Sequence, residues 1–100
     1  MKYNKLVRDR TPEMIKGDGG DPKFHIATDE EYWVELKEKL LEEVGEFLRS
    51  ENEKELADVV EVIEAIVKTG RVNEQKLVAE ISKKAKEKGR FQKRIILEEA

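Results

Sequence analysis

A chain of 100 residues is long enough for one domain with a thin hydrophobic core, and we expect residues 1–100 to form a single domain. Charged residues make up 43% of the chain and hydrophobic residues 38%, which is typical of helices that each bury one stripe. The absence of cysteine excludes disulfides and thiolate metal sites, and no apolar run approaches the ~20 residues that cross a membrane. The N-terminus also lacks the apolar segment of a signal peptide, so we expect a cytoplasmic protein.

The first elements along the chain are short. Residues 1–10 are basic, and the pair Thr11 and Pro12 is typical of an N-cap followed by the first position of a helix. This helix should end before residues 17–22, whose glycines and proline predict a loop. We expect residues 24–27 to be briefly extended.

Two long helices should follow and form an antiparallel hairpin. Thr28, with Glu31 three residues later, has the pattern of a capping box and predicts a helix that runs to about Ser50. Asn52 repeats this pattern and opens a second helix, which should stop at Gly70. Because only a few residues separate the two helices, they should lie side by side.

A third long helix should begin after Asn73 and end near Gly89, and the apolar tail of residues 91–97 should dock against the rest of the chain. The predicted fold is therefore all-α: an antiparallel helical hairpin with a third long helix packed across it. The apolar arcs of the long helices are wider than one small protomer covers. We therefore expect the bundle to be completed by homo-oligomerisation, as a dimer or a dimer of dimers.

Charge is distributed unevenly along the chain. Residues 29–64 carry 14 acidic and four basic residues, a net charge of −10, whereas the remaining segments carry nine acidic and 16 basic residues, a net of +7. This distribution suits a metal site flanked by groups that bind phosphate. The alternative is that surface helices are simply charged.

Four carboxylates stand out within the acidic segment. Glu43 and Glu46 are three residues apart, as are Glu55 and Asp58, so each pair lies on one side of its helix. Two adjacent helices would bring all four together, and such a cluster needs cations to stabilise it. Oxygen ligands without histidine or cysteine favour Mg²⁺ or Mn²⁺, and Mg²⁺ held by carboxylates is typical of phosphate chemistry.

The positions of these carboxylates relative to the apolar stripes support this interpretation. A helix advances about 100° per residue, so Glu43 lies at the edge of the stripe of the first long helix and Glu46 about 60° further round. That stripe consists of Trp33, Leu36, Leu40, Val44 and Phe47. Glu42 lies almost opposite the stripe and should face solvent unless a partner covers it.

On the second helix, Glu55 lies within the apolar arc and Asp58 about 60° to the same side. A buried carboxylate without a partner costs several kcal/mol, which indicates a specific role for Glu55. The alternative is that Glu55 only completes the capping box of Asn52.

Basic residues are candidates for binding phosphates. Lys84 continues the apolar stripe of the third helix and is the first candidate, with Lys5, Arg8 and Arg94 as helpers. The alternative for each is an ordinary surface cation.

The acidic motifs resemble those of the MazG-like nucleoside triphosphate pyrophosphohydrolases, an all-α superfamily that includes dimeric dUTPases and phosphoribosyl-ATP pyrophosphohydrolase. The family pattern of Glu-Glu-x-x-Glu followed by Glu-x-x-Asp is matched by residues 42–46 and 55–58. Residues 3–9 (Tyr-Asn-Lys-Leu-Val-Arg-Asp) resemble the opening of a short, phosphoribosyl-ATP pyrophosphohydrolase-like subgroup. The C-terminal segment resembles its close through Lys84, Ala85, Gly89, Phe91 and residues 93–97. Arg90 departs from the pattern, which has a second glycine there.

The resemblance implies Mg²⁺-dependent hydrolysis of a nucleoside triphosphate to a monophosphate and pyrophosphate, including removal of non-standard nucleotides. It implies that the ions are held by Glu43, Glu46, Glu55 and Asp58, and that they neutralise the phosphates and activate the attacking water.

Two other classes remain open: a catalytically silent nucleotide or metal sensor that uses the same pocket, and a helical dimerisation module with a solvated acidic face. The position of Glu55 argues against the dimerisation module, and the complete set of four carboxylates argues mildly against the silent sensor. A nucleic-acid binder ranks lowest, because the acidic segment would repel phosphates in the absence of metal.

Overall fold

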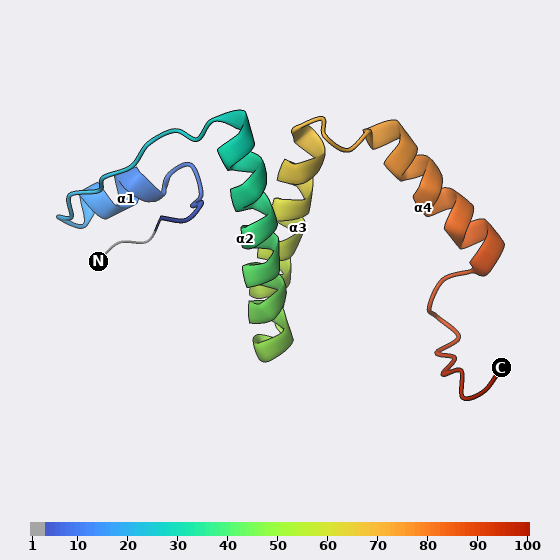
Figure 1. Ribbon diagram of the computed structural model, residues 1–100. Helices are drawn as coiled ribbons and strands as arrows, with labels where there is room; N and C mark the ends of the chain where they lie inside the picture. The colour runs from blue at the N-terminus through green and yellow to red at the C-terminus, as the bar shows by residue number, and fades with distance from the viewer. Residues whose placement is uncertain (1–3) are drawn as a thin grey trace.

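The computed structural model describes residues 4–100, which form four α-helices and no strand (Figure 1). The helices are α1 (Thr11–Gly17), α2 (Asp29–Ser50), α3 (Glu53–Lys68) and α4 (Glu74–Lys88). The all-α class predicted from the sequence is confirmed. Tyr3, the first residue of the N-terminal motif, lies outside the described residues. Among residues 4–100, no helix combines the length and the apolar character that crossing a bilayer requires.

Helices α2 and α3 form the predicted hairpin, with their axes side by side and their directions opposed (Figure 1). The chain reverses within two residues because Glu51 adopts a left-handed conformation (φ 56°) and its N–H donates to the carbonyl of Phe47 at 2.7 Å. The most buried apolar side chains are Leu36 of α2, which is 1% exposed, and Val62 of α3, which is 8% exposed. The core of the described chain therefore lies between these two helices.

Side-chain caps define where the three long helices begin, as predicted. The side chains of Thr28, Asn52 and Asn73 each accept a hydrogen bond from the backbone N–H three residues later, at 3.2, 3.0 and 2.9 Å. Each cap satisfies a backbone donor that the helix itself leaves unpaired. The predicted boundaries of α2, α3 and α4 are confirmed to within one or two residues.

The start of α1 differs from the prediction. Arg10 is the N-cap and makes no side-chain cap hydrogen bond, while Thr11 is already helical and Pro12 occupies the second position. A turn held by a backbone bond from the Thr11 N–H to the Arg8 carbonyl, at 3.0 Å, precedes the helix. Because this turn orients the chain into α1, the Thr11 side chain is not needed as a cap.

The prediction that the third long helix packs across the hairpin is wrong. In Figure 1, α4 extends from the hairpin on the side away from α1, and the described chain measures 58 × 30 × 21 Å. Its radius of gyration is 18.0 Å, whereas a compact chain of this length has about 13 Å. The direction changes in residues 69–73, where Gly70 takes a left-handed conformation (φ 80°) before Asn73 begins α4.

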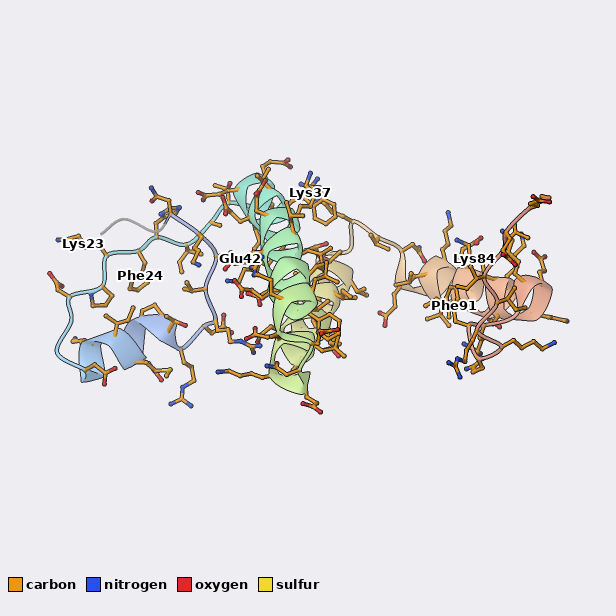
Figure 2. The ribbon with its side chains drawn as sticks, turned by 90° about the horizontal axis from the view of Figure 1, so that it is seen from below. Lys23, Phe24, Lys37, Glu42, Lys84 and Phe91 are labelled. Atoms are coloured by element: carbon orange, nitrogen blue, oxygen red, sulfur yellow. The ribbon has the colours of Figure 1, made fainter. Side chains whose placement is uncertain are left out.

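The C-terminal tail, which we expected to dock against the rest of the chain, is largely exposed. Phe91 is 97% exposed and Ile96 is 83% exposed. The tail instead follows the end of α4, where Phe91 and Gln92 line a shallow hollow with Lys84 and Ala85 (Figure 2).

Candidate metal and phosphate site

Three of the four predicted carboxylates meet where α2 and α3 pack together. One oxygen each of Glu43, Glu55 and Asp58 lies within 4.8 Å of the others. Glu43 is only 7% exposed, and Glu55 and Asp58 are half-buried. We call these three residues the acidic cluster.

The acidic cluster follows from the positions of its members on the two helices. Glu43 lies next to the buried Leu36 in angular position, and Glu55 and Asp58 lie on either side of the buried Val62. All three side chains therefore lie along the contact between the two helices.

The structure also bears on the alternative that the Glu55 side chain only completes the capping box of Asn52. The Glu55 backbone N–H donates to Asn52 Oδ1 at 3.0 Å, so Asn52 caps α3. The carboxylate of Glu55 instead points toward Glu43 and Asp58. Its position in the first turn of α3 is also favourable for a negative charge, because the helix dipole is positive there.

Residues 4–10, which we call the N-terminal strap, bring two predicted phosphate-binding residues to the acidic side of the hairpin. Arg8 Nη2 donates to Asp58 Oδ1 at 2.7 Å, and Lys5 Nζ donates to Glu42 Oε1 at 3.0 Å. The hydrogen bond with Asp58 raises the pKa of the Arg8 guanidinium, and the bond with Glu42 raises the pKa of Lys5. Both cations are thus held next to the acidic cluster by residues distant in sequence.

Glu42 is covered from within the same chain. We expected it in solvent unless a partner covered it, and the strap is that partner: Glu42 is half-buried and faces the N-terminal segment (Figure 2). The hydrogen bond from Lys5 lowers the pKa of Glu42 below its usual value, with a further contribution from the positive charge of Lys39.

Lys39 is the residue that sequence reasoning missed. Its Nζ lies 3.4 Å from Glu43 Oε1 and 3.6 Å from Glu42 Oε1, and its side chain is only 19% exposed. Lysine three and four residues before two glutamates is the spacing of intrahelical ion pairs, so the sequence held the signal. Lys39 balances part of the negative charge beside the acidic cluster.

The other predicted site residues lie elsewhere. Glu46 pairs with Arg49 at 3.0 Å and is not part of the acidic cluster. Lys84 lies on α4 and Arg94 in the tail, at the end of the molecule remote from Glu42 (Figure 2 labels Lys84). For these three residues the predicted roles stay predictions.

The donor atoms of the acidic cluster are of the type that a hard divalent cation prefers. Mg²⁺ binds oxygens at about 2.1 Å, so two oxygens on opposite sides of the ion lie about 4.2 Å apart. Adjacent oxygens around the same ion lie only about 3 Å apart, so oxygens as far as 4.8 Å from one another would have to move closer together to share one ion. The ligands are all carboxylate oxygens, which Mg²⁺ and Mn²⁺ prefer.

No protein-family model matches the chain, and no solved structure matches it. A stretch of 41 residues is 51% identical to part of an uncharacterized protein of Mycolicibacterium smegmatis. This stretch covers 41% of the present chain and 42% of the relative, so the match spans about two fifths of the relative's length. The relative therefore supports no assignment of family or activity.

Proposed function

We propose that this chain is a Mg²⁺-dependent nucleoside triphosphate pyrophosphohydrolase, which cleaves the α–β phosphoanhydride bond to give a monophosphate and pyrophosphate. The observation that carries the proposal is the convergence of Glu43, Glu55 and Asp58 from two helices to within 4.8 Å of one another. The resemblance of residues 42–46 and 55–58 to the acidic motifs of MazG-like enzymes supports it. The cytoplasmic location expected from the N-terminal sequence stays a prediction.

In this proposal the three carboxylates of the acidic cluster hold Mg²⁺ or Mn²⁺. When bound, the ion neutralises phosphate charge and lowers the pKa of a water molecule so that it attacks at neutral pH. Glu43 is the most fixed of the three, because it is buried and paired with Lys39. Glu46, on the same helix, is one turn away and supplies a further oxygen if it exchanges Arg49 for the ion.

Arg8 and Lys5 are the cations best placed to bind the phosphates. A guanidinium binds two phosphate oxygens at once, and Arg8 already lies 2.7 Å from a member of the cluster. A triphosphate that enters with its metal competes with Asp58 and Glu42 for these two cations, so the strap would transfer from carboxylates to phosphates. The result is a site whose positive groups are in place before the substrate arrives.

The experiment is a screen of nucleoside triphosphates, including non-standard ones, for release of pyrophosphate with Mg²⁺, with Mn²⁺ and with chelator. We expect turnover of at least one triphosphate that stops on chelation. The matched pair of variants is Asp58→Asn and Glu61→Gln, because Glu61 is exposed on the same helix and outside the cluster. Turnover that survives Asp58→Asn but not Glu61→Gln contradicts the proposed site.

A second candidate is a nucleotide or metal sensor without turnover. It would use the same cluster and the same neighbouring cations, Lys39 and Arg8, but would need no activated water. Calorimetric titration separates the two: a sensor binds Mg²⁺ and a triphosphate but releases no pyrophosphate. The third class, a helical dimerisation module whose acidic residues form only a solvated face, stays an open alternative to both.

A further inference from the structure

The C-terminal end of the molecule concentrates positive charge. Residues 83–97 carry seven basic residues and one acidic residue, a net charge of +6. The basic residues are Lys83, Lys84, Lys86, Lys88, Arg90, Lys93 and Arg94. Within residues 4–100, every ion pair uses a cation from outside this stretch. We call residues 83–97 the basic segment, and its charges are free to contact an external anion.

Only a small part of this charge has an ordinary structural role. Lys86 and Lys88 lie in the last turn of α4, where a positive charge stabilises the helix dipole. Arg90, Lys93 and Arg94 follow the end of the helix, so the dipole does not account for them. The strap differs in the same respect, because its Lys5 and Arg8 are both paired with carboxylates of the hairpin.

Large apolar side chains lie among these cations and are mostly in contact with water. Phe91 is 97% exposed, and Ile95, Ile96 and Leu97 are between 76% and 83% exposed. A turn in which the Arg94 N–H donates to the Phe91 carbonyl at 3.1 Å separates Phe91 from the three aliphatic residues. Apolar surface in water is unfavourable, so the basic segment suits a partner that takes up apolar groups as well as positive charge.

The shallow hollow beside the last turn of α4 combines both properties. Lys84 and Arg90 line it together with Ile81, Ala85 and Phe91. In Figure 1 this end of the molecule projects away from the hairpin, so the hairpin does not cover the hollow. Two cations beside apolar side chains suit a phosphate group that is joined to an apolar chain.

A bilayer that contains anionic phospholipids offers both kinds of contact. Each lysine or arginine near such a surface strengthens binding about fivefold. Exposed aromatic and aliphatic side chains enter the boundary between headgroups and acyl chains. Lys84 and Lys88 extend the apolar stripe of α4, and long lysine side chains reach from such positions to the headgroups.

Nucleic acid is a poorer match for the basic segment. Proteins that bind single strands combine contacts to phosphates with aromatic side chains on which bases stack. Phe91 is the one aromatic residue among residues 83–97, whereas Ile95, Ile96 and Leu97 are aliphatic. Consecutive aliphatic side chains gain more from acyl chains than from the faces of bases.

We propose that the basic segment binds the surface of a bilayer that contains anionic phospholipids, with α4 lying on the bilayer and not across it. Residues 29–64, with their net charge of −10, are repelled by the same surface. This repulsion orients the molecule with its C-terminal end toward the lipid and its acidic cluster away from it. The proposal is independent of the proposed hydrolase activity, and its failure would leave that activity untouched.

The test is sedimentation of the full chain with lipid vesicles at about 0.1 M salt. One set of vesicles is an equal mixture of phosphatidylglycerol and phosphatidylcholine, and the other is phosphatidylcholine alone. We expect at least tenfold stronger binding to the mixed vesicles, most of which is lost at about 0.5 M salt because salt screens the charges. Equal binding to the two sets of vesicles, or binding to neither, overturns the proposal.

A pair of charge variants tests whether the basic segment makes the contact. Lys83→Gln with Lys86→Gln should weaken binding to the mixed vesicles by about tenfold or more, at about fivefold per charge. The matched control, Lys16→Gln with Lys23→Gln, changes the net charge equally at exposed positions near the N-terminus and should bind like the wild type. Equal weakening by both pairs shows that only the net charge of the chain matters and contradicts the proposal.

A pair of apolar variants tests whether side chains enter the lipid. Serine at Ile95, Ile96 and Leu97 should weaken binding at least tenfold with unchanged helix content, because these residues follow the end of α4. The control replaces Met14 and Phe24, each 64% exposed, with serine and should bind like the wild type. Full binding by the triple serine variant overturns the proposal.

Fluorescence reports on the contact directly. Trp33 is the only tryptophan of the chain, so the double variant Trp33→Phe, Phe91→Trp places one reporter in the basic segment. Its emission should shift to the blue with the mixed vesicles and stay unchanged with phosphatidylcholine. If the chain binds the mixed vesicles without this shift, another surface faces the lipid and the proposal is wrong.

The same variants identify two rival partners, duplex DNA and the acidic hairpin of a second copy. Suppose that the chain ignores both sets of vesicles. If Lys83→Gln with Lys86→Gln then weakens binding to duplex DNA, the basic segment binds nucleic acid. If it instead lowers the mass in light scattering to that of one chain, the segment contacts a second copy. Either result overturns the proposal.

Discussion

Helices α3 and α4 have nearly the same length, 16 and 15 residues, and both begin after a capping asparagine. Helix α3 nevertheless packs along α2 and buries Val62, whereas no residue of α4 is buried. The difference lies in the width of the apolar arc. Seven leucine, isoleucine and valine residues line α3, but only three lie on α4, where lysines flank the stripe. The comparison teaches that a cap specifies where a helix begins, while the apolar arc decides whether it packs.

The prediction with the largest expected effect asks whether activity depends on residues of the α2–α3 hairpin alone or also on α4. Asp58→Asn should lower the rate of pyrophosphate release by at least a hundredfold, because losing a ligand charge costs about 3 kcal/mol in the transition state. Glu61→Gln should change the rate little. If Lys84→Ala is as damaging as Asp58→Asn, then α4 reaches the acidic cluster during the reaction, and the contrast between α3 and α4 does not hold for function.

The second prediction concerns stability. Leu36→Ala should lower the free energy of unfolding by about 2 to 3 kcal/mol, measured by urea denaturation, because Leu36 is 1% exposed. Ile81→Ala on α4 should cost well under half as much, since Ile81 is 54% exposed. Equal losses would mean that α4 is packed in solution.

The third prediction uses the metal. At ten times its dissociation constant, Mg²⁺ should stabilise the folded chain by about 1.4 kcal/mol, which raises the melting temperature by several degrees. Glu61→Gln should keep this shift and Asp58→Asn should lose most of it. If millimolar Mg²⁺ leaves the melting temperature of the wild type unchanged, the acidic residues form only a solvated face.

The fourth prediction compares the two asparagine caps. Asn52→Ala should destabilise the hairpin by about 1 kcal/mol, because it removes the bond to the Glu55 N–H. Asn73→Ala should reduce the helix content of α4 but leave the unfolding midpoint of the hairpin unchanged. Circular dichroism during thermal unfolding measures both quantities, and a common shift in midpoint would show that α3 and α4 unfold together.

The smallest effect is the pH dependence of the pair Lys5 and Glu42. The lowered pKa of Glu42 contributes stability above its usual value of 4.5, and this contribution is lost as pH falls through the lowered value. The raised pKa of Lys5 contributes stability below 10.5, which is lost as pH rises through the raised value. The stability difference between wild type and Lys5→Met should therefore be largest between about pH 5 and 10. It should be small even there, because the side chains of Lys5 and Glu42 are 44% and 36% exposed and solvent screens the pair. A difference that persists unchanged in acid would contradict the assignment.

Much of the site was predictable because it depends on helical phase. Glu43 was expected at the edge of one apolar stripe, Glu55 within the other and Asp58 about 60° to the same side. The structure brings the three carboxylates within 4.8 Å. The spacing of Lys39 from two glutamates was also readable. The position of the strap was not predictable from the sequence. Lys5 and Arg8 bind partners 37 and 50 residues away, and no local pattern encodes such contacts.

The sequence by itself determined the helices and the faces that they present. Caps and glycines act within a few residues, so the limits of α2, α3 and α4 could be read from Thr28, Asn52, Asn73 and Gly89. Only the tertiary structure decided which faces meet. It placed the strap over Glu42, left Glu46 with Arg49, and directed α4 away from the hairpin at Gly70. Hydrophobic burial is non-directional, so an amphipathic stripe specifies that a helix needs a partner but not which partner it takes.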